Sequence, residues 1–566
     1  MSGTRFVAVL VAALTAPTAA APLAAQEPAP IQAGVAPSPG PYAPGVDVLH
    51  YEVEVALEEG SDRFLASVGL DVAVQGHQAI LPLDLTGLEI TDLTLEGRTV
   101  PYLYEEGVVR VPLAGTVPGD TVRVALTYGG VPDDGLILRD NVHGAPAAFV
   151  DNWPNRTRFW LPTVDHPADK ATVRYTVHAP TGWQVIANGH LVSEPGPTPV
   201  GALGTAGDRR TWLWEVGVPI STYNMVIGAA DMEIRTVGLA ACGRAPASRR
   251  DDGCVEVTTW IFPQDVQKAE PSFRRAAQMV DYFTQTIGDY PFSKLANVQS
   301  ATRFGGMENA SAIFYSEQAI ASGRDIEGTV SHEIAHQWFG DAVTQASWHH
   351  LWLSEGFATY FGALFFEAAD GVEAFRERME GSRIRVVGSS DVERPVIDPE
   401  ETDLFELLND NNYPKGGWVL HMLRGLLGDD AFFAGIRTYY DRHVHQAVLT
   451  EDFQAAMEDA SREDLDWFFT QWLHRPGFPV FEVDERWVPG EGDGGHAEVV
   501  VRQVQRESWP RFRVPLELCW GSGHERQCRA AVSGSSEDTF RFEFDRPPQG
   551  QVALDPDGWV LKEVRP

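Results

Sequence analysis

The sequence predicts an α+β protein of several domains: an N-terminal all-β domain, a mainly helical central domain and a C-terminal β-sandwich. Apolar residues recur with a period of two from about residue 47 to 235 and with a helical period from about 265 to 475. The period of two returns after Pro476-Gly477-Phe478-Pro479. The 566 residues, 44% of them hydrophobic and 10% aromatic, can build more than one core, so we expect a folded chain.

The N-terminal segment is typical of an export signal. Arg5 supplies positive charge, residues 6–14 are apolar, and small residues lead to Ala25. We predict a signal peptide over 1–25, a flexible Pro/Ala/Gly-rich linker over 26–46, and a periplasmic or extracellular protein. An uncleaved anchor is the alternative. No later segment has 18 uninterrupted apolar residues, so we expect no membrane span after cleavage.

Cysteine usage agrees with export. The four cysteines form two local pairs, Cys242 with Cys254 and Cys519 with Cys528, each around a short polar stretch that contains glycine. Three disulfide connectivities are open in principle, and local pairing is the simplest. Neither pair has the Cys-x-x-Cys spacing of a zinc site.

The chain is strongly acidic. Asp and Glu number 79 against 44 Lys and Arg, which gives a formal net charge of −35. This charge disfavours nucleic acid and anionic membranes as partners. It identifies no partner by itself, because an excess of one sign is most often a solvated surface.

Residues 47–240 are predicted to be the N-terminal β domain. Turn signals such as Pro118-Gly119-Asp120 separate runs in which apolar and polar residues alternate. Such alternation indicates sheets with one buried face. The inward positions are expected to be Tyr51, Val53, Val55, Leu57, Val122, Val124, Leu126, Tyr128, Val173, Tyr175 and Val177.

Residues 241–475 are predicted to be mainly helical. Apolar residues at helical spacing over 273–287 indicate one helix, which can end at Gly288. Gly340 is placed to end a second helix, and Gly371 a third.

The remaining signals concern the end of the chain. Thr450, which two acidic residues follow, is expected to cap the start of a further helix. Residues 476–566 are long enough for a small β-sandwich. Its apolar alternation runs through Phe512, Val514, Leu516, Leu518 and Trp520, and through Phe540, Phe542 and Phe544.

Residues 332–336 read His-Glu-Ile-Ala-His. On a helix, His332 and His336 lie one turn apart on one face, where both imidazoles can reach one metal ion. Glu333 stands where it can act as a base on water. A chance occurrence of this short motif is the alternative. It is opposed by Glu355, a carboxylate among mostly apolar neighbours, because such a group needs a cationic partner. Two His and one Glu leave a fourth position open on zinc, as in catalytic sites.

Four segments in this order resemble the gluzincin aminopeptidases, the group that contains aminopeptidase N and leukotriene hydrolase. A looser match runs from Arg158 to Pro167. The resemblance implies a thermolysin-like fold for residues 241–475. The four segments are Gly305-Gly306-Met307-Glu308-Asn309, His332 to Gly340, Trp352 to Tyr360, and Tyr413-Pro414-Lys415-Gly416.

By position, the resemblance implies the ligands and the catalytic groups. His332, His336 and Glu355 would hold one zinc ion per chain. Glu333 would be the general base on a zinc-activated water. Tyr413 would stabilise the tetrahedral intermediate, since a phenol opposite the metal can donate to a developing oxyanion. Without the family, a core or surface tyrosine is the simpler interpretation of Tyr413.

The resemblance also implies a substrate-binding strand. It comprises Gly305, Gly306, Met307, Glu308 and Asn309, in which the glycines let a peptide backbone approach closely. Glu308 would bind the free α-amino group of the substrate. Family members often carry a second amine contact, a glutamine or glutamate, just upstream of Arg158. Here Asp151 is the candidate.

The sequence therefore predicts a zinc-dependent aminopeptidase acting on peptides with a free N-terminus. A zinc endopeptidase and an epoxide hydrolase are alternatives, the first opposed by Glu308 and the second in need of a long apolar tunnel. A non-catalytic peptide-binding protein on the same scaffold is a third. Such a protein would be expected to have lost a ligand or the base, and none is missing from the motifs.

Overall fold

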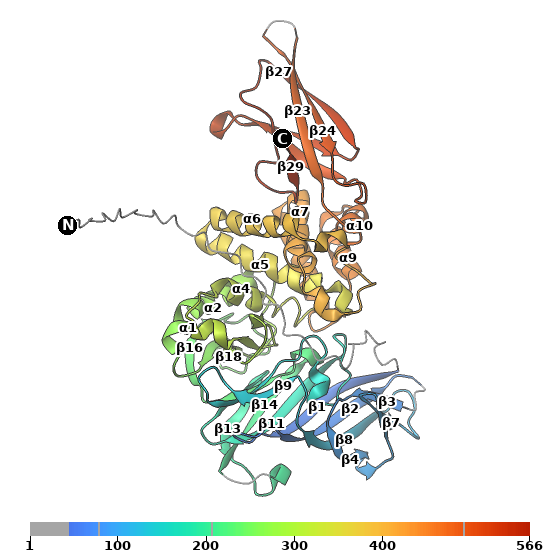
Figure 1. The fold of residues 1–566 in the computed structure, drawn as a ribbon, viewed down its shortest axis with the longest axis vertical. Helices are drawn as coiled ribbons and strands as arrows, with labels where there is room; N and C mark the ends of the chain where they lie inside the picture. Colours follow the sequence, from blue (N-terminus) through green and yellow to red (C-terminus); the bar gives the residue numbers. More distant parts are fainter. Residues whose placement is uncertain (1–44, 77–79, 205–207, 491–492, 566) are drawn as a thin grey trace, which may run out of the picture.

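The computed structural model describes residues 45–76, 80–204, 208–490 and 493–565. The chain is elongated, with the N-terminal sheets at one end, the helices in the middle and the C-terminal strands at the other end (Figure 1). This arrangement confirms the predicted fold class. The predicted signal peptide, and all but the last two residues of the predicted linker, lie outside the described residues. Among the helices that are described, none is long and apolar enough to cross a bilayer.

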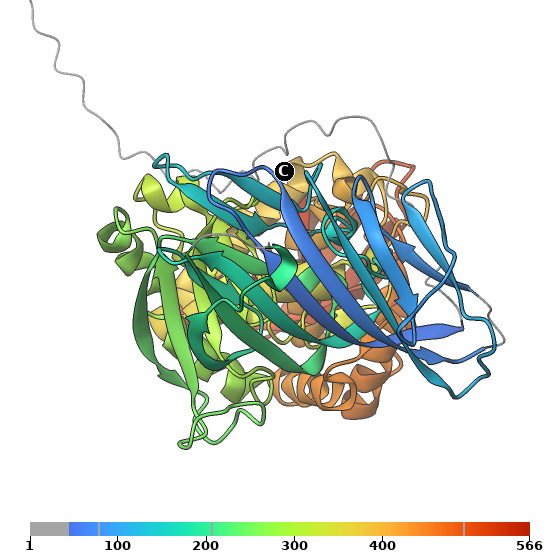
Figure 2. The same cartoon turned by 90° about the horizontal axis from the view of Figure 1, so that it is seen from below.

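Over the described residues, the N-terminal part forms an eight-stranded, a four-stranded and a three-stranded sheet. The curved eight-stranded sheet dominates the view from below (Figure 2), and in it β1 pairs in parallel with β11 and antiparallel with β2. In spatial order its strands are β13 (His190–Pro197), β14 (Arg209–Ser221), β11 (Lys170–Pro180), β1 (Val46–Ala56), β2 (Phe64–Val74), β8 (Thr121–Gly130), β4 (Glu89–Leu95) and β5 (Arg98–Thr99). The four-stranded sheet is β12 (Gln184–Ala187), β15 (Ile227–Ala230), β10 (Pro146–Val150) and β9 (Leu136–Asp140), and the three-stranded sheet is β3 (Ile80–Asp84), β7 (Val108–Pro112) and β6 (Leu103–Glu105).

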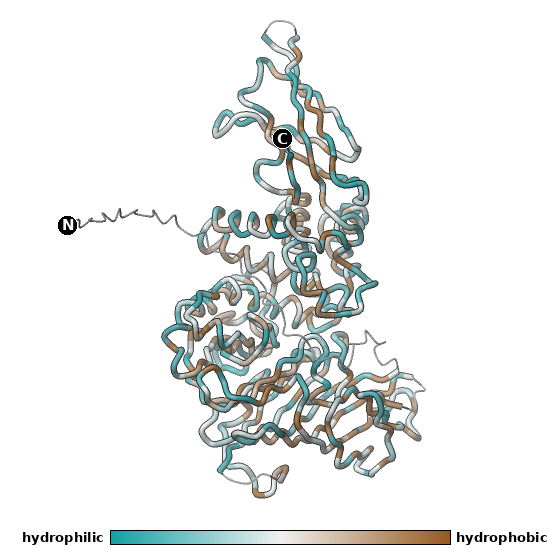
Figure 3. Tube along the Cα trace, in the orientation of Figure 1, coloured by the Kyte–Doolittle hydropathy of each residue, from teal (hydrophilic) through white to brown (hydrophobic). Residues whose placement is uncertain are grey.

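The predicted alternation in these strands is confirmed. Each position expected to point inward is buried, from Tyr51 on β1 to Val177 on β11. Hydrophobic stretches alternate with hydrophilic ones along the strands (Figure 3). The alternation places apolar side chains on one face of each strand, where they form the core.

The central part opens with a five-stranded sheet that the sequence interpretation did not identify. In the described part of the chain its order is β16 (Glu233–Ala240), β17 (Val255–Ile261), β18 (Leu295–Ser300), β20 (Ala312–Ser316) and β19 (Gly306–Met307). Strands β18 and β20 are buried at every residue, so they show no alternation. Because β16 pairs with β17, residues 233–240 share this sheet, although the predicted boundary at residue 240 assigns them to the first domain.

Helices make up most of the remaining central part, as predicted. A two-stranded pair, β21 (Thr344–Gln345) and β22 (Ala447–Val448), joins its two halves. The helices are α1 (Val266–Phe273), α2 (Ala276–Thr286), α3 (Glu317–Ala321), α4 (Glu327–Ala335), α5 (Trp352–Asp370), α6 (Val372–Gly388), α7 (Gly416–Leu427), α8 (Asp429–His443), α9 (Thr450–Ser461) and α10 (Asp466–Leu473).

The predicted helix ends are correct in part. Gly371, with a φ of 96°, directly follows α5 as expected. Helix α4 ends at Ala335, earlier than Gly340 predicts, and the chain then makes a tight turn. Thr450 is the first residue of α9 and not its cap. The cap comes from Asp452, whose carboxylate accepts from the N–H of Leu449 at 2.9 Å.

The C-terminal part is a sandwich of two sheets in the residues described, as predicted. Trp520 on one sheet packs against Phe542 and Phe544 on the other, with ring centroids 5.8 and 5.1 Å apart. Disulfides Cys242–Cys254 and Cys519–Cys528 confirm the local pairing. The sheets are β27 (Glu537–Phe544), β24 (Gly495–Gln503), β23 (Val480–Pro489) and β29 (Glu563–Arg565), and β26 (Gln527–Ser533), β25 (Val514–Trp520) and β28 (Ala553–Leu554).

Candidate metal and catalytic site

Helices α4 and α5 cross closely and bring the two motifs together. A β-carbon on Gly362 would lie 3.3 Å from the Cα of His332, so glycine lets the two backbones approach. Ser331 strengthens the crossing by donating its hydroxyl to the carbonyl of Gly362 at 3.1 Å. As a result, Glu355 in the first turn of α5 faces the end of α4.

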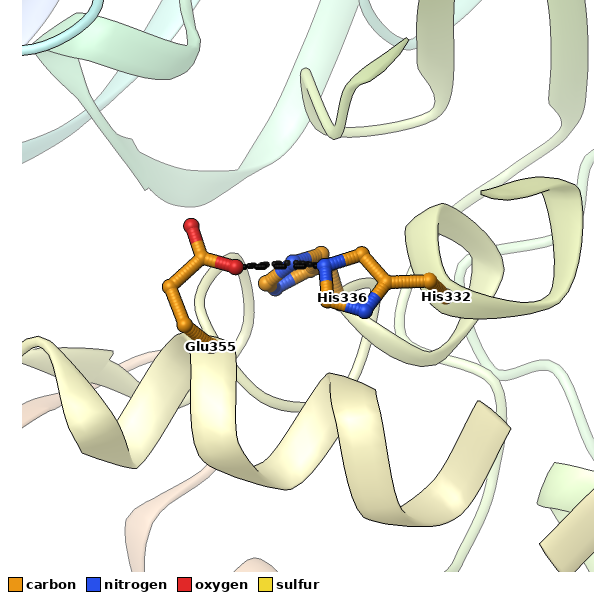
Figure 4. Close-up of side chains that lie close together, drawn as sticks. All are labelled: His332, His336 and Glu355. Carbon is orange, nitrogen blue, oxygen red and sulfur yellow. Dashed lines mark hydrogen bonds and ion pairs between the residues drawn. The ribbon is translucent and has the colours of Figure 1, made fainter. Parts of the chain in front are cut away.

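The three predicted metal ligands converge (Figure 4). The carboxylate atom Oε2 of Glu355 lies 3.1 Å from Nε2 of His332 and 3.2 Å from Nε2 of His336. The two imidazole Nε2 atoms are 3.0 Å apart. His336 is buried, whereas the side chain of His332 is 19% exposed, so the group has access to solvent from one side.

The orientation of His336 is fixed through its other nitrogen. Nδ1 lies 3.0 Å from the carbonyl oxygen of Phe339 and 3.0 Å from Oγ of Ser354. A carbonyl only accepts, so Nδ1 carries a proton, and Nε2 is the nitrogen that faces the other two ligands. This is the second-layer contact that metal-binding histidines usually make. Gly340 makes room for it, because a β-carbon there would lie 2.4 Å from Oγ of Ser354.

The electrostatics of the site favour a cation. Burial lowers the pKa of His336, but the carboxylates of Glu355, Glu308 and Glu333 raise it more, to about 10. For Glu355 the two effects are reversed. Burial raises its pKa, but the two imidazoles lower it more, to about 2. Two imidazoles and one carboxylate within 4.8 Å of one another are a donor set that suits zinc.

Glu333 faces the same space from the next position on α4. Glu333 is only 5% exposed, and burial raises its pKa well above the usual value. A carboxylate oxygen of Glu333 and one of Glu308 lie within 4.8 Å of a nitrogen of His336. Glu333 is therefore close enough to exchange a proton with a molecule that reaches the three ligands.

Glu308 lies at the end of the short strand β19. It is 4% exposed, and burial raises its pKa to about 7. Strand β19 pairs antiparallel with the buried strand β20, Gly306 with Tyr315 and Met307 with Phe314. This pairing leads the chain to Glu308, a carboxylate oxygen of which lies within 4.8 Å of a nitrogen of His336.

Tyr413 approaches from a single π-helical turn, η7 (Asn411–Lys415). Its ring stacks on that of His332 with centroids 6.0 Å apart and planes at 10°. Burial and the nearby Glu355 raise its pKa well above the usual value, so the phenol stays a donor. The Gly356–Gly416 contact permits this placement, since a β-carbon on either glycine would lie 2.9 Å from the Cα of the other.

Asp151 does not stand free in the site. Its Oδ2 lies 3.1 Å from Nη2 of Arg156 and 3.3 Å from Nε of Arg303, and it also accepts from the backbone N–H of Arg303. Its Oδ1 accepts from Thr302 at 3.3 Å. This carboxylate already has two cationic partners, so its contact with a substrate amine stays a prediction that the geometry does not favour.

The remaining residues of the predicted substrate strand differ in exposure. Gly305 is exposed and Gly306 is partly exposed, whereas Met307 is 3% exposed. Asn309 is fully buried, and its amide makes no hydrogen bond to the described residues. The two glycines are therefore the part of this strand that a peptide backbone can reach.

Sequence reasoning missed the polar residues that support the site from behind. Tyr223 donates its hydroxyl to the carbonyl of Gly340 at 3.1 Å, and Asn224 donates to Asp341 at 2.8 Å. Gln337 bonds to both Glu308 and Asp341. The available signal was the same as for Glu355, since Gln337 and Asp341 are polar residues within an apolar stretch.

The chain is similar to known proteins. Residues 272–472 match the family model described as "Peptidase family M1 domain". The chain is 26% identical over 71% of its length to "Probable aminopeptidase 2" of Sulfurisphaera tokodaii, of which 50% is covered. It is also 26% identical over 80% of its length to "Aminopeptidase N" of Streptomyces lividans, with 53% of that protein covered. The chain thus spans about half the length of these relatives.

Two solved structures have a similar fold. An M1 zinc metallopeptidase mutant from Deinococcus radiodurans superposes with a TM-score of 0.65 at 25% identity. A mutant two-domain M1 zinc metallopeptidase bound to L-tryptophan superposes with a TM-score of 0.66 at 23% identity. Each match covers 77% of this chain and 96% of the other.

Proposed function

From the premise that this chain belongs to the gluzincin, aminopeptidase N-like family, we propose that it is an exported zinc aminopeptidase that removes N-terminal residues from peptides. The observation that carries the proposal is the convergence of His332, His336 and Glu355. The names of the relatives and the M1 domain point to the same activity. The local disulfides and the signal-like segment support export.

The ligand set defines the cofactor that we propose. His332, His336 and Glu355 would hold one zinc ion per chain, because two neutral imidazoles and a carboxylate match its catalytic ligand sets. Zinc, when bound, supplies the Lewis acidity that polarises the scissile carbonyl and acidifies water. The family is one of zinc metallopeptidases, which agrees with this donor set.

The residues around the ligands have complementary tasks. Glu333 takes a proton from the attacking water and later delivers it to the leaving amine. Tyr413, kept protonated by its environment, donates to the oxygen that gains negative charge at the carbonyl. These two side chains come from different elements, α4 and η7, so one can act on the water while the other donates to the carbonyl oxygen.

Recognition of the free N-terminus is assigned to Glu308. Its carboxylate is buried beside the ligands, and an ammonium group is the cation that the end of a peptide offers. The ion pair would form where little water can enter, and there the attraction between the two charges is stronger than in water. Because the amine anchor lies so near the ligands, the first peptide bond is the one placed for cleavage.

A panel of aminoacyl fluorogenic amides tests the proposal. We expect cleavage of free-amine substrates, loss of cleavage in a chelator, and recovery when zinc is added back. N-acetylated twins of the same amides should be cleaved far more slowly. Equal cleavage of both sets would favour a zinc endopeptidase. Binding of peptides without any cleavage in the zinc-loaded protein would favour a binding protein.

A further inference from the structure

Gln337, which directly follows the second histidine, links the metal-binding turn to the amine-binding segment. Its side chain is fully buried. Nε2 donates to the backbone carbonyl of Glu308 at 2.7 Å and to Oδ2 of Asp341 at 2.7 Å. Oε1 accepts the backbone N–H of Ser311 at 2.7 Å. Both protons of the amide nitrogen and its carbonyl oxygen are therefore in use.

These bonds hold the start of a segment whose other supports lie further along, where Asn188 donates to the carbonyl of Ala310 at 2.7 Å and the N–H of Gly189 donates to the hydroxyl of Ser311 at 2.7 Å. Strand β19 ends at Met307, so the backbone of Glu308 lies beyond its ladder. Ser311, with a φ of 64°, marks a tight reversal before β20. The amide of Gln337 bonds on both sides of this reversal, at the carbonyl of Glu308 and the N–H of Ser311.

Asp341, the second acceptor of the Gln337 amide, is also held in place. Asp341 is buried, and its second oxygen accepts from Asn224 at 2.8 Å. The backbone carbonyl of Asp341 accepts from Nζ of Lys170 at 3.0 Å. Gln337 therefore joins the Glu308 segment to a turn that the N-terminal sheets hold in place.

We infer that Gln337 is a positioning residue that sets the distance between the zinc ligands and the amine anchor Glu308. The inference rests on the proposed function. In an aminopeptidase the N-terminal amine and the scissile carbonyl belong to one amino acid residue, so their binding groups must keep a fixed separation. Because Gln337 is next to His336 in the chain and bonds to Glu308, it transmits the position of one to the other.

Gln299 offers a matched control. It is also fully buried, and its amide makes the same three kinds of bond. Nε2 donates to a carboxylate, that of Asp265, at 2.8 Å and to a carbonyl, that of Glu317, at 3.3 Å. Its Oε1 accepts the N–H of Phe262 at 3.1 Å. None of these bonds reaches the backbone of residues 305–311.

The experiment compares Gln337→Met with Gln299→Met in the zinc-loaded protein. Gln299→Met removes three buried hydrogen bonds, and Gln337→Met removes the same three kinds together with a longer one of 3.5 Å from the hydroxyl of Tyr290. Both variants keep a nearly constant side-chain volume, so both should lower thermal stability. We expect only Gln337→Met to raise KM for free-amine amides, by about tenfold or more, since a misplacement of about 1 Å can cost that much. We expect kcat to fall much less and zinc content to stay equal.

A second measurement does not need activity. Hydrogen–deuterium exchange of the segment 305–312 should be faster in Gln337→Met and unchanged in Gln299→Met. Unchanged exchange together with an unchanged KM would overturn the inference. The wild-type protein could lack chelator-sensitive activity while Gln337→Met still speeds exchange in this segment. That result would contradict the proposed function and leave the positioning role of Gln337 in place. If Gln337→Met does not fold, Gln337→Asn replaces it, with Gln299→Asn as its control, because the shorter amide stays polar but its bonds to Glu308 and Ser311 are lengthened or lost.

Discussion

Gly306 lies directly against the carboxylate of Glu333: a β-carbon built on Gly306 would stand 2.3 Å from Oε1 of Glu333. The strand that would carry the substrate and the helix that carries the proposed base therefore touch through a glycine. Any side chain at residue 306 must displace the carboxylate or the strand. Glycine is therefore needed at position 306 because a side chain has no room there, apart from any need for backbone freedom.

Gly306→Ala should therefore impair catalysis without unfolding the protein. We expect kcat/KM to fall by about 100-fold or more, because the base is moved out of place. Zinc content and thermal stability should stay near wild type. Gly305→Ala is the matched control, since a β-carbon there meets nothing within 4 Å. Equal losses in both variants would show that the contact with Glu333 is not the cause.

Replacing the base should separate chemistry from metal binding. Glu333→Gln keeps the size of the side chain, so zinc content should match wild type. Turnover should fall by at least about 100-fold, because the amide cannot accept the proton of water. Glu327→Gln, on the same helix and paired with Arg275, serves as the control. Residual activity in Glu333→Gln above about one per cent would remove its assignment as base.

Removing the carboxylate ligand should weaken metal binding. For Glu355→Ala we expect a clear loss of zinc after dialysis, read by elemental analysis, together with loss of activity. Glu367→Ala on the same helix, where Glu367 pairs with Arg424, should keep its zinc. A full complement of zinc in Glu355→Ala would contradict the ligand assignment.

Substitution of the amine anchor should change substrate preference. Glu308→Gln removes the negative charge that an ammonium group would meet. We expect KM for free-amine amides to rise by about tenfold or more, whereas N-acetylated substrates should be affected little. The readout is the ratio of kcat/KM for the two substrate sets. A ratio equal to that of wild type would refute amine recognition by Glu308.

Lys415 gives a prediction for stability. It is fully buried, and Nζ makes no hydrogen bond to the described residues. Burial lowers its pKa from 10.5 to about 7. Between these values the unfolded chain binds a proton that the folded chain does not, so the contribution of Lys415 to the free energy of unfolding rises with pH. Its destabilising effect is largest below pH 7 and disappears near pH 10.5.

Lys415→Met should therefore raise the free energy of unfolding at pH 7, by an amount of the order of a few kcal/mol. The gain over wild type should shrink steadily as the pH approaches 10. Denaturant midpoints of both proteins at several pH values check this expectation. A gain that is the same at every pH would show that packing, and not the amine, is responsible.

The sequence predicted well where a local pattern carried the information. Alternation located the strands, and Gly371 located the end of α5. His332, Glu333 and His336 follow from their spacing, and Glu355 from a carboxylate among apolar neighbours. In each case, the residues that decide the structure lie within a few positions of one another.

The rest depended on contacts between distant residues. Strands β18 and β20 are buried on both faces, so nothing in their pattern separates them from the surrounding helices. Asp151 meets Arg303, which lies 152 positions further along the chain, and sequence spacing reveals no such partner. The need for glycine at position 306 becomes visible only in the folded structure, where β19 lies beside α4.

The hydrogen bonds that Lys170, Tyr223 and Asn224 make to residues 340–342 have a consequence for engineering. All three donors come from the N-terminal half, yet they satisfy buried acceptors in the turn that follows the second histidine. A fragment that begins after residue 240 would lose all three donors, and of these acceptors the carbonyl of Asp341 would keep its bond from the hydroxyl of Thr344. The region with the two histidines is therefore not a transplantable unit, and a shortened or chimeric version should keep the first β region attached to it.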